Sequence, residues 1–243
     1  MNSKSPRHGV ARTISKLGLG SRTQAAQWVR EGRVRVNDRL VTDPEFPVKQ
    51  GLDRVTVDGQ ANAPARMVVM LNKPRGLVTT TRDEQGRDTV YSCFKGADLP
   101  WLAPIGRLDK ASEGLLLFSN DPAWAARVAS PASGPGKTYH VQINRLPDAA
   151  LLDALERGAS VDGERLAAKS ARSLRSGQKN AWLEIALDEG RNRQIRRLLR
   201  AFDVSVLRLV RVSVGNLQLG DLPKGEWRAL NAQEIEMLVP AEG

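Results

Sequence analysis

One carboxylate in this chain stands where a reactive group would be displayed. Asp109 ends the segment Gly106-Arg107-Leu108-Asp109, and the apolar run Leu115-Leu116-Leu117-Phe118 follows it. A glycine turn before the carboxylate and a run typical of a buried strand after it would hold it on a rigid support. Arg107 supplies a neighbouring cation, and Gly114 leaves room for another group to come close. The pattern predicts a single ionised carboxylate at Asp109.

An arginine-rich segment is the second group of candidate residues. In the segment 189–202, Ile195, Leu198, Leu199 and Phe202 recur at the spacing of one helical face. We therefore expect a helix opened by Gly190, with guanidinium groups beside its apolar stripe. Because acidic residues four positions further along the chain are absent, we interpret these arginines as a phosphate or carboxylate site rather than a solvated face. The candidate binding residues are Arg191, Arg193, Arg196 and Arg197.

Two further segments carry groups that suit a nucleotide. Tyr139 stands at the start of an alternating run, where its ring could stack on a base and its hydroxyl could move a proton. Taken alone, a tyrosine in a strand is more often a packing residue. Lys73 lies in the turn segment Asn72-Lys73-Pro74-Arg75-Gly76, which holds two cations. Both segments are candidates for contact with an anionic substrate.

The composition narrows the kinds of partner and compartment. The chain has 243 residues and a net charge of +10, an excess that favours a polyanion such as nucleic acid. One cysteine, Cys93, excludes an intramolecular disulfide and fits a reducing compartment. One cysteine and two histidines also argue against a zinc site. No apolar run approaches the roughly 20 residues that a bilayer requires, and the first residues are polar. We expect a cytosolic protein without membrane association.

The segments that other enzyme classes require are absent from the sequence. Asp109 has no neighbouring motif carboxylate for a glycosidase pair, and no serine is arranged with a histidine as a nucleophile. No glycine-rich loop suggests a dinucleotide or a methyl donor, which disfavours an RNA methyltransferase. A lone carboxylate among arginines remains, either in an enzyme acting on RNA or in a non-catalytic RNA-binding protein of ribosome assembly.

The sequence predicts a small basic domain in the N-terminal part of the chain. We place a disordered tail at residues 1–8, the domain at 9–59 and a linker at 60–65. Ser21 and Gln24 form a helix-capping pattern, and Gly32 ends that helix. The pattern Ser-Arg-x-x-Ala…Gly-x-Val-x-Val-Asn resembles the S4 RNA-binding domain over about residues 10–58. Its expected RNA-binding face carries Arg22, Arg30, Arg33 and Arg35.

The remaining part, residues 66–243, mixes strands and helices without regular alternation. Strands outnumber helices, so we predict an α+β fold with a largely antiparallel mixed sheet. Strands are expected at 67–71, 115–119, 139–143 and 181–187. Helices are expected at 122–128 and 149–157, with a last one capped by Asn231 and Glu234.

Four ordered motifs carry a resemblance over nearly the whole chain. The segment Gly-Arg-Leu-Asp-x-x-Ser-x-Gly-Leu-Leu-Leu-Phe-Ser-Asn-Asp at 106–121 closely resembles the active-site motif of pseudouridine synthases. The segments at 71–76, 137–139 and 189–197 resemble companion motifs of the RsuA-type branch, which also has an S4-like domain. The resemblance implies isomerisation of uridine in ribosomal RNA to pseudouridine, without cofactor or metal, by a chain that we expect to be a monomer.

The resemblance also implies roles for individual residues. Asp109 matches the catalytic aspartate, Tyr139 the tyrosine that stacks on the uracil, and Arg196 the arginine that pairs with the aspartate. Leu209 matches an apolar residue near the base. Further substrate contacts are expected from Arg107, Lys73, Arg191, Arg193 and Arg197. The segments 189–194 and 222–227 favour 23S rRNA as substrate, with 16S rRNA as the alternative. Ser130 stands where histidine is frequent in this branch.

Overall fold

The computed structural model describes residues 7–49, 51–59, 64–81, 83–131 and 133–239. The chain divides into two compact units, and residues 1–68 belong to the first together with 96–103 and 118–125. The predicted linker at 60–65 falls mostly on residues 60–63, which lie outside the described residues, so that boundary stays a prediction. The predicted disordered tail at 1–8 overlaps the described part only at Arg7 and His8, which belong to a strand.

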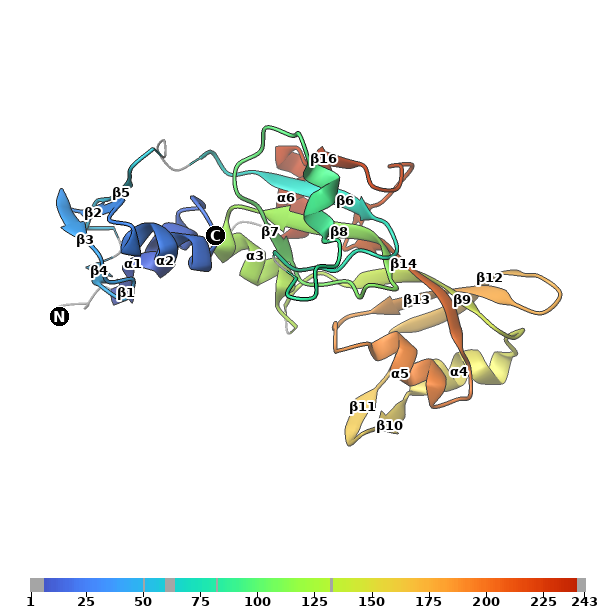
Figure 1. Ribbon diagram of the computed structural model, residues 1–243. Coiled ribbons are helices and arrows are strands. Elements are labelled where there is room, and N and C mark those ends of the chain that lie inside the picture. The colour runs from blue at the N-terminus through green and yellow to red at the C-terminus, as the bar shows by residue number, and fades with distance from the viewer. Residues whose placement is uncertain (1–6, 50, 60–63, 82, 132, 240–243) are drawn as a thin grey trace. The chain divides into compact units, whose positions relative to one another are not determined.

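The N-terminal helices and strands pack around their own core, as Figure 1 shows in blue. Ser21 caps α2 by accepting a hydrogen bond from the Gln24 backbone N–H, as predicted. Asn37 and Asp38 both adopt positive φ, which makes the turn between β2 and β3. The helices are α1 (Val10–Lys16) and α2 (Arg22–Arg30). The strands are β1 (Arg7–Gly9), β2 (Val34–Val36), β3 (Arg39–Val41), β4 (Pro47–Lys49) and β5 (Val55–Val57).

A nine-stranded sheet forms the framework of the larger unit. Its main order is β12-β13-β9-β14-β8-β6-β16, with β15 paired to β14 and β7 paired to β8. The pairing of β14 with β8 is parallel, whereas β14 pairs antiparallel with β9. The predicted α+β fold with a mixed sheet is confirmed. The strands are β6 (Val68–Lys73), β7 (Ala103–Ile105), β8 (Glu113–Ser119), β9 (Lys137–Ile143), β12 (Ser170–Ser176), β13 (Ala181–Leu187), β14 (Val206–Val214), β15 (Leu217–Gln218) and β16 (Trp227–Ala229).

Side chains cap the first turns of two predicted helices in this unit. Asp148 accepts a hydrogen bond from the Leu151 backbone N–H, and Asn231 forms a reciprocal capping box with Glu234. The predicted helix at 149–157 and the predicted last helix are confirmed. The helices are η1 (Val90–Phe94), α3 (Pro122–Ala129), α4 (Ala149–Arg157), α5 (Gln194–Arg200) and α6 (Ala232–Leu238), and a hairpin is formed by β10 (Ala159–Val161) and β11 (Glu164–Leu166). None of the helices described is long and apolar enough to span a membrane.

The predicted arginine-rich helix is shorter than expected. It begins at Gln194 rather than near Gly190, because Arg193 adopts a left-handed conformation with φ +49°. Ile195, Leu198 and Leu199 are buried, so the apolar stripe is confirmed for these three residues, whereas Phe202 lies beyond the helix and is partly buried. Arg193 therefore precedes the helix. It is not part of the row of arginines that the helical spacing predicted.

Strand β14 lies at the centre of the sheet, although no strand was predicted from the sequence for these residues. Its burial alternates, so that Leu209 and Arg211 are buried while Arg208 and Val210 are partly exposed. Charged residues at both positions of the alternation obscured the strand. The strand matters because Leu209 and Arg211 face the pocket described below.

Gly114 allows β8 to lie unusually close to β14. A Cβ atom there would lie 2.2 Å from the backbone oxygen of Arg211, and Gly114 has φ +101°. The close approach expected at Gly114 is thus made by the backbone of β14. Both the steric contact and the positive φ require glycine.

We expect Gly114→Ala to lower the free energy of unfolding by at least about 3 kcal/mol, because backbone strain and overpacking add. Gly86→Ala is a matched control, since Gly86 also has positive φ (+67°) but no atom would lie within 4 Å of its Cβ. The control should lose only about 1–2 kcal/mol. Urea unfolding of both variants measures the difference, and equal losses would show that the contact with β14 is relaxed at little cost.

Candidate active site

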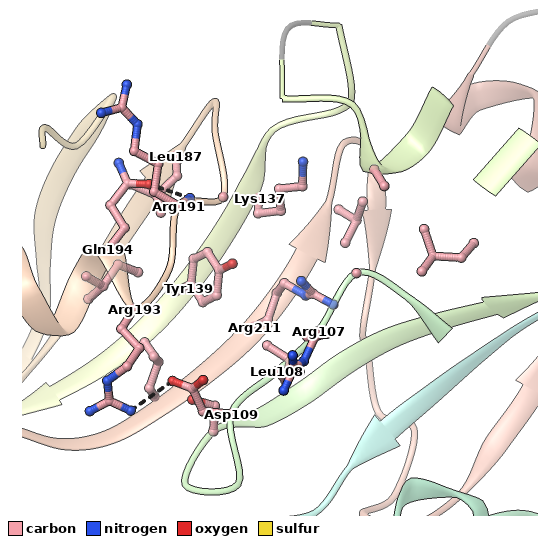
Figure 2. A pocket seen from close by; sticks show the side chains of 18 of the residues that line it. Arg107, Leu108, Asp109, Lys137, Tyr139, Leu187, Arg191, Arg193, Gln194 and Arg211 are labelled. Carbon is pink, nitrogen blue, oxygen red and sulfur yellow. Dashed lines mark hydrogen bonds and ion pairs between the residues drawn. The ribbon is translucent and has the colours of Figure 1, made fainter. Parts of the chain in front are cut away.

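A pocket opens on the face of the sheet that carries Tyr139, Leu209 and Arg211 (Figure 2). The segment after β7 supplies Asp109, and the turn before α5 supplies Arg193. The cavity volume is about 180 Å³. Pockets for drug-sized ligands measure roughly 300–1,000 Å³, so this one suits a single planar ring.

Asp109 forms an ion pair across the pocket with Arg193. The Arg193 Nη1 atom donates to the Asp109 Oδ2 atom over 3.1 Å (Figure 2). The two side chains are 37% and 50% exposed, respectively, so the pair is open to solvent and to a ligand. A partly exposed pair contributes little to stability. The ion pair instead orients the Asp109 carboxylate, because the Arg193 guanidinium holds one of its oxygens.

Arg196 does not make the ion pair with Asp109 that the sequence predicted. Its guanidinium donates to the backbone oxygens of Ala111 and Val206, over 3.3 and 3.4 Å. Its Nε atom is buried and has no hydrogen-bond partner among the described residues. Burial and then the charge of Arg193 lower the pKa of Arg196. Arg193 takes the predicted place because it precedes α5, whereas Arg196 lies within the helix and contacts the loop backbone.

Tyr139 and Leu209 line the pocket from the same face of two neighbouring strands. In the register of β9 and β14, Tyr139 lies opposite Arg211 and Val141 lies opposite Leu209. Side chains two positions apart in a strand share a face, so Tyr139, Leu209 and Arg211 point the same way. Tyr139 is 9% exposed and Leu209 is 7% exposed. Together they form an aromatic and aliphatic wall that a flat base could contact.

Lys73 is buried beneath the segment that carries Asp109, and it does not line the pocket. Its side chain is fully buried, and its Nζ atom donates to the backbone oxygens of Asp109, Ser112 and Pro74. The predicted contact between Lys73 and substrate is therefore not supported by its position. Two of these hydrogen bonds hold the backbone at Asp109 and Ser112, and the third holds the backbone at Pro74. Burial lowers the pKa of Lys73 to about 8.

We expect the contribution of Lys73 to stability to rise with pH above about 8. Its folded pKa of about 8 lies below its ordinary value of 10.5, so between these values the unfolded chain binds a proton that the folded chain does not. The free energy of unfolding rises with pH wherever the unfolded state binds more protons. Relative to Lys73→Met, wild type should gain about 2 kcal/mol between about pH 7.5 and 9.5, measured by urea unfolding. A difference that stays constant would show that the buried amine keeps its proton.

The other predicted arginines divide between the pocket and a neighbouring hairpin. Arg107 and Arg191 line the pocket, and Arg191 also donates to Glu189 and to the Arg165 backbone oxygen. Arg197 does not line it. The guanidinium of Arg197 binds Glu164, Asp162 and the Val161 backbone oxygen of the β10–β11 hairpin. The sequence predicted no acidic partners for these arginines, because spacing along a helix reveals only neighbours within that helix.

Three residues that line the pocket were not predicted from the sequence, and they are Lys137, Gln194 and Arg211. Arg211 is 6% exposed, and its Nε atom donates to the Leu115 backbone oxygen over 2.7 Å. Burial and then the charge of Arg211 lower the pKa of Lys137. Gln194 is buried and accepts a hydrogen bond from the Arg191 backbone N–H (Figure 2). Lys137 could have been found from its place in the Lys-Thr-Tyr motif, whereas Arg211 lies in a strand that the sequence did not predict and gave no signal.

The arginines predicted to form the RNA-binding face of the N-terminal unit lie at its surface. Arg22, Arg30 and Arg35 are exposed, and Arg33 is partly exposed. The Arg33 guanidinium lies over the Trp28 ring and donates to the Asp58 backbone oxygen. These contacts hold Arg33 in place, whereas Arg22 and Arg30 border a shallow hollow on α2.

The fold and the motifs agree with one enzyme family. Residues 67–201 match the RNA pseudouridylate synthase family, and residues 10–53 match the S4 domain. The chain therefore belongs to the RNA pseudouridylate synthase family and is an enzyme of that class. The predicted family and the predicted S4 domain are confirmed.

Individual relatives match over almost their whole length. The chain is 35% identical to an uncharacterized RNA pseudouridine synthase of Aquifex aeolicus (strain VF5), covering 96% of this chain and 94% of the relative. It is 33% identical to ribosomal large subunit pseudouridine synthase B of Bacillus subtilis (strain 168), covering 94% of each. A crystal structure of a pseudouridylate synthase matches with a TM-score of 0.66 and 30% identity, covering 96% of this chain and 100% of that one.

Proposed function

We propose that this enzyme converts a uridine of ribosomal RNA to pseudouridine, with 23S rRNA as the substrate. The observation that carries the proposal is Asp109, held by Arg193 in a pocket with an aromatic wall at Tyr139. The likeness to a relative named for the large ribosomal subunit supports 23S rRNA over 16S rRNA. We further propose that it acts in the cytoplasm as a monomer.

The target uridine must leave its stack to reach this pocket. Flipping a nucleotide out of folded RNA costs a few kcal/mol. Phosphate contacts from the basic N-terminal domain and from Arg107 and Arg191 at the pocket would offset that cost. The pocket volume suits one base, and Tyr139 and Leu209 would contact its plane.

The proposed reaction is an isomerisation that keeps every atom of the nucleotide except one proton. The bond between C1′ of the ribose and N1 of uracil breaks, the uracil rotates, and a bond forms between C1′ and C5. The proton on C5 is lost to solvent, and N1 gains a proton. Asp109 is the proposed catalytic carboxylate, and Tyr139 is the candidate for moving the C5 proton.

The experiment that tests the reaction and its substrate uses rRNA labelled with tritium at uridine C5. Purified enzyme is incubated separately with 23S and 16S fragments and with ribosomal assembly intermediates. Release of tritium from 23S RNA is the expected result. The modified nucleotide is then identified as the pseudouridine that is present in the parent strain and absent from a strain lacking the enzyme. Release only from 16S RNA would move the substrate to the small subunit. No release from any of these RNAs would favour an RNA-binding role without catalysis.

A further inference from the structure

The face of the sheet opposite the catalytic pocket carries a row of side chains that the reaction does not use. Alternation along β9 and β14 turns Gln142 and Arg208 away from Tyr139 and Leu209. The register aligns one residue from each of four neighbouring strands, which Figure 1 labels β12, β13, β9 and β14. The row, called the Trp182 row below, consists of Arg175, Trp182, Gln142 and Arg208.

Trp182 lies between two guanidinium groups. The Arg175 and Arg208 Cζ atoms lie 5.2 and 5.4 Å from the centroid of its ring. Trp182 is partly exposed. A shallow hollow on this face is lined by His140, Leu174, Arg175, Trp182, Arg208 and Val210. Packing alone does not require a partly exposed aromatic ring with an arginine on each side of it at a surface hollow.

The charges on this face leave a positive excess around the row. Arg172 is paired with Glu184, and Glu113 accepts hydrogen bonds from both Arg208 and Lys224. Arg175 is exposed and has no acidic partner among the described residues. Two carboxylates therefore meet four cations, since Arg175 adds to the three that are paired. This excess favours an anionic ligand over a neutral or basic one.

We propose that the Trp182 row is a second RNA-binding surface, which takes an unpaired stretch of RNA away from the nucleotide that reacts. Aromatic rings stack on bases of any sequence, and arginines contact phosphates or stack on bases themselves. The Trp182 row presents both groups at one hollow. Because an rRNA substrate extends beyond one nucleotide, the surface would add affinity without contacting the reacting base.

The test uses the full-length protein and an oligoadenylate of about 12 nucleotides that carries one 8-azidoadenosine. This probe contains no uridine, so its binding is independent of isomerisation. Ultraviolet light should attach it to a peptide within β12 or β13, and fluorescence anisotropy gives the dissociation constant. Trp182→Ala and Arg175→Glu should each reduce attachment at this site and weaken the site's affinity about 5-fold to 100-fold.

Matched variants separate binding from folding and from catalysis. Trp182→Phe keeps a ring and should retain most of the attachment, and Arg157→Glu changes the same charge at an exposed position of α4. Circular dichroism checks that each variant is folded. Attachment confined to other elements, or the same yield with Arg175→Glu as with Arg157→Glu, would overturn the proposal and leave this face to a protein partner. Tritium release from a short 23S fragment, measured in parallel, reports on the pocket separately.

Discussion

Asp109→Asn should abolish the release of tritium from 23S rRNA labelled at uridine C5, with a loss of at least about 10⁴-fold in turnover. The change keeps the size of the side chain and its place in the loop, yet it removes the negative charge that the proposed reaction requires. Losing a group that reacts directly with substrate has effects of this size in other enzymes. RNA affinity should stay within about threefold, because an amide fits the same space and the phosphate contacts are untouched.

A control identifies the effect as local to the pocket. Asp153→Asn removes a carboxylate at an exposed position of α4, and this variant should release tritium at the wild-type rate. Gel-shift binding with the same RNA measures affinity for all three proteins. If Asp109→Asn released tritium as fast as wild type, the proposed role of Asp109 would be wrong even though the family assignment would stand.

Arg193→Met should lower kcat by about 100-fold while changing RNA affinity little. The structure makes Arg193 the positioning residue for Asp109, since its Nη1 atom lies 3.1 Å from the carboxylate. Removing one hydrogen-bond donor that stabilises developing charge in a transition state costs about 10²–10³ in kcat, and we expect the lower end of that range for a donor that orients the reacting carboxylate. Arg193→Lys should restore part of the activity, because it keeps the charge but loses the planar fork of donors.

Arg196→Met is the matched comparison on the same segment. Arg196 reaches the loop only through the backbone oxygen of Ala111, so its loss should lower turnover less than the loss of Arg193 does. Single-turnover rates at saturating enzyme separate turnover from binding. Suppose instead that Arg193→Met were fully active and that Arg196→Met lowered kcat by at least about 100-fold. The ion pair between Arg193 and Asp109 would then form only in the enzyme without RNA. Arg196 would then be the partner of Asp109 in the complex with RNA, as the family resemblance implies.

Local patterns predicted the elements whose signals lie close together in the chain. The helix at 149–157 and the strand at 181–187 have the predicted bounds. Each depends on a cap or an alternation that is complete within about ten residues. The arginine-rich helix was placed several residues too early, because the left-handed turn at Arg193 has no local sequence signal.

Partners distant in the chain could not be predicted from spacing. Arg197 was expected at the substrate, and instead it binds Glu164, 33 residues away, in a hairpin. Lys73 was expected at the substrate and is buried beneath the backbone of Asp109, 36 residues away. Charge and residue type suggest that such a group is important, but they do not show which side of a loop it occupies.

The sequence by itself determined the family, the lone carboxylate at Asp109, the tyrosine at 139 and the α+β class, because each follows from an ordered motif or a short-range period. The tertiary structure alone decided that Arg193 pairs with Asp109, that Arg211 enters the pocket and that the Trp182 row forms on the opposite face. The physical reason is strand register: residues separated by tens of positions become neighbours only when β14 pairs with β8 and β9.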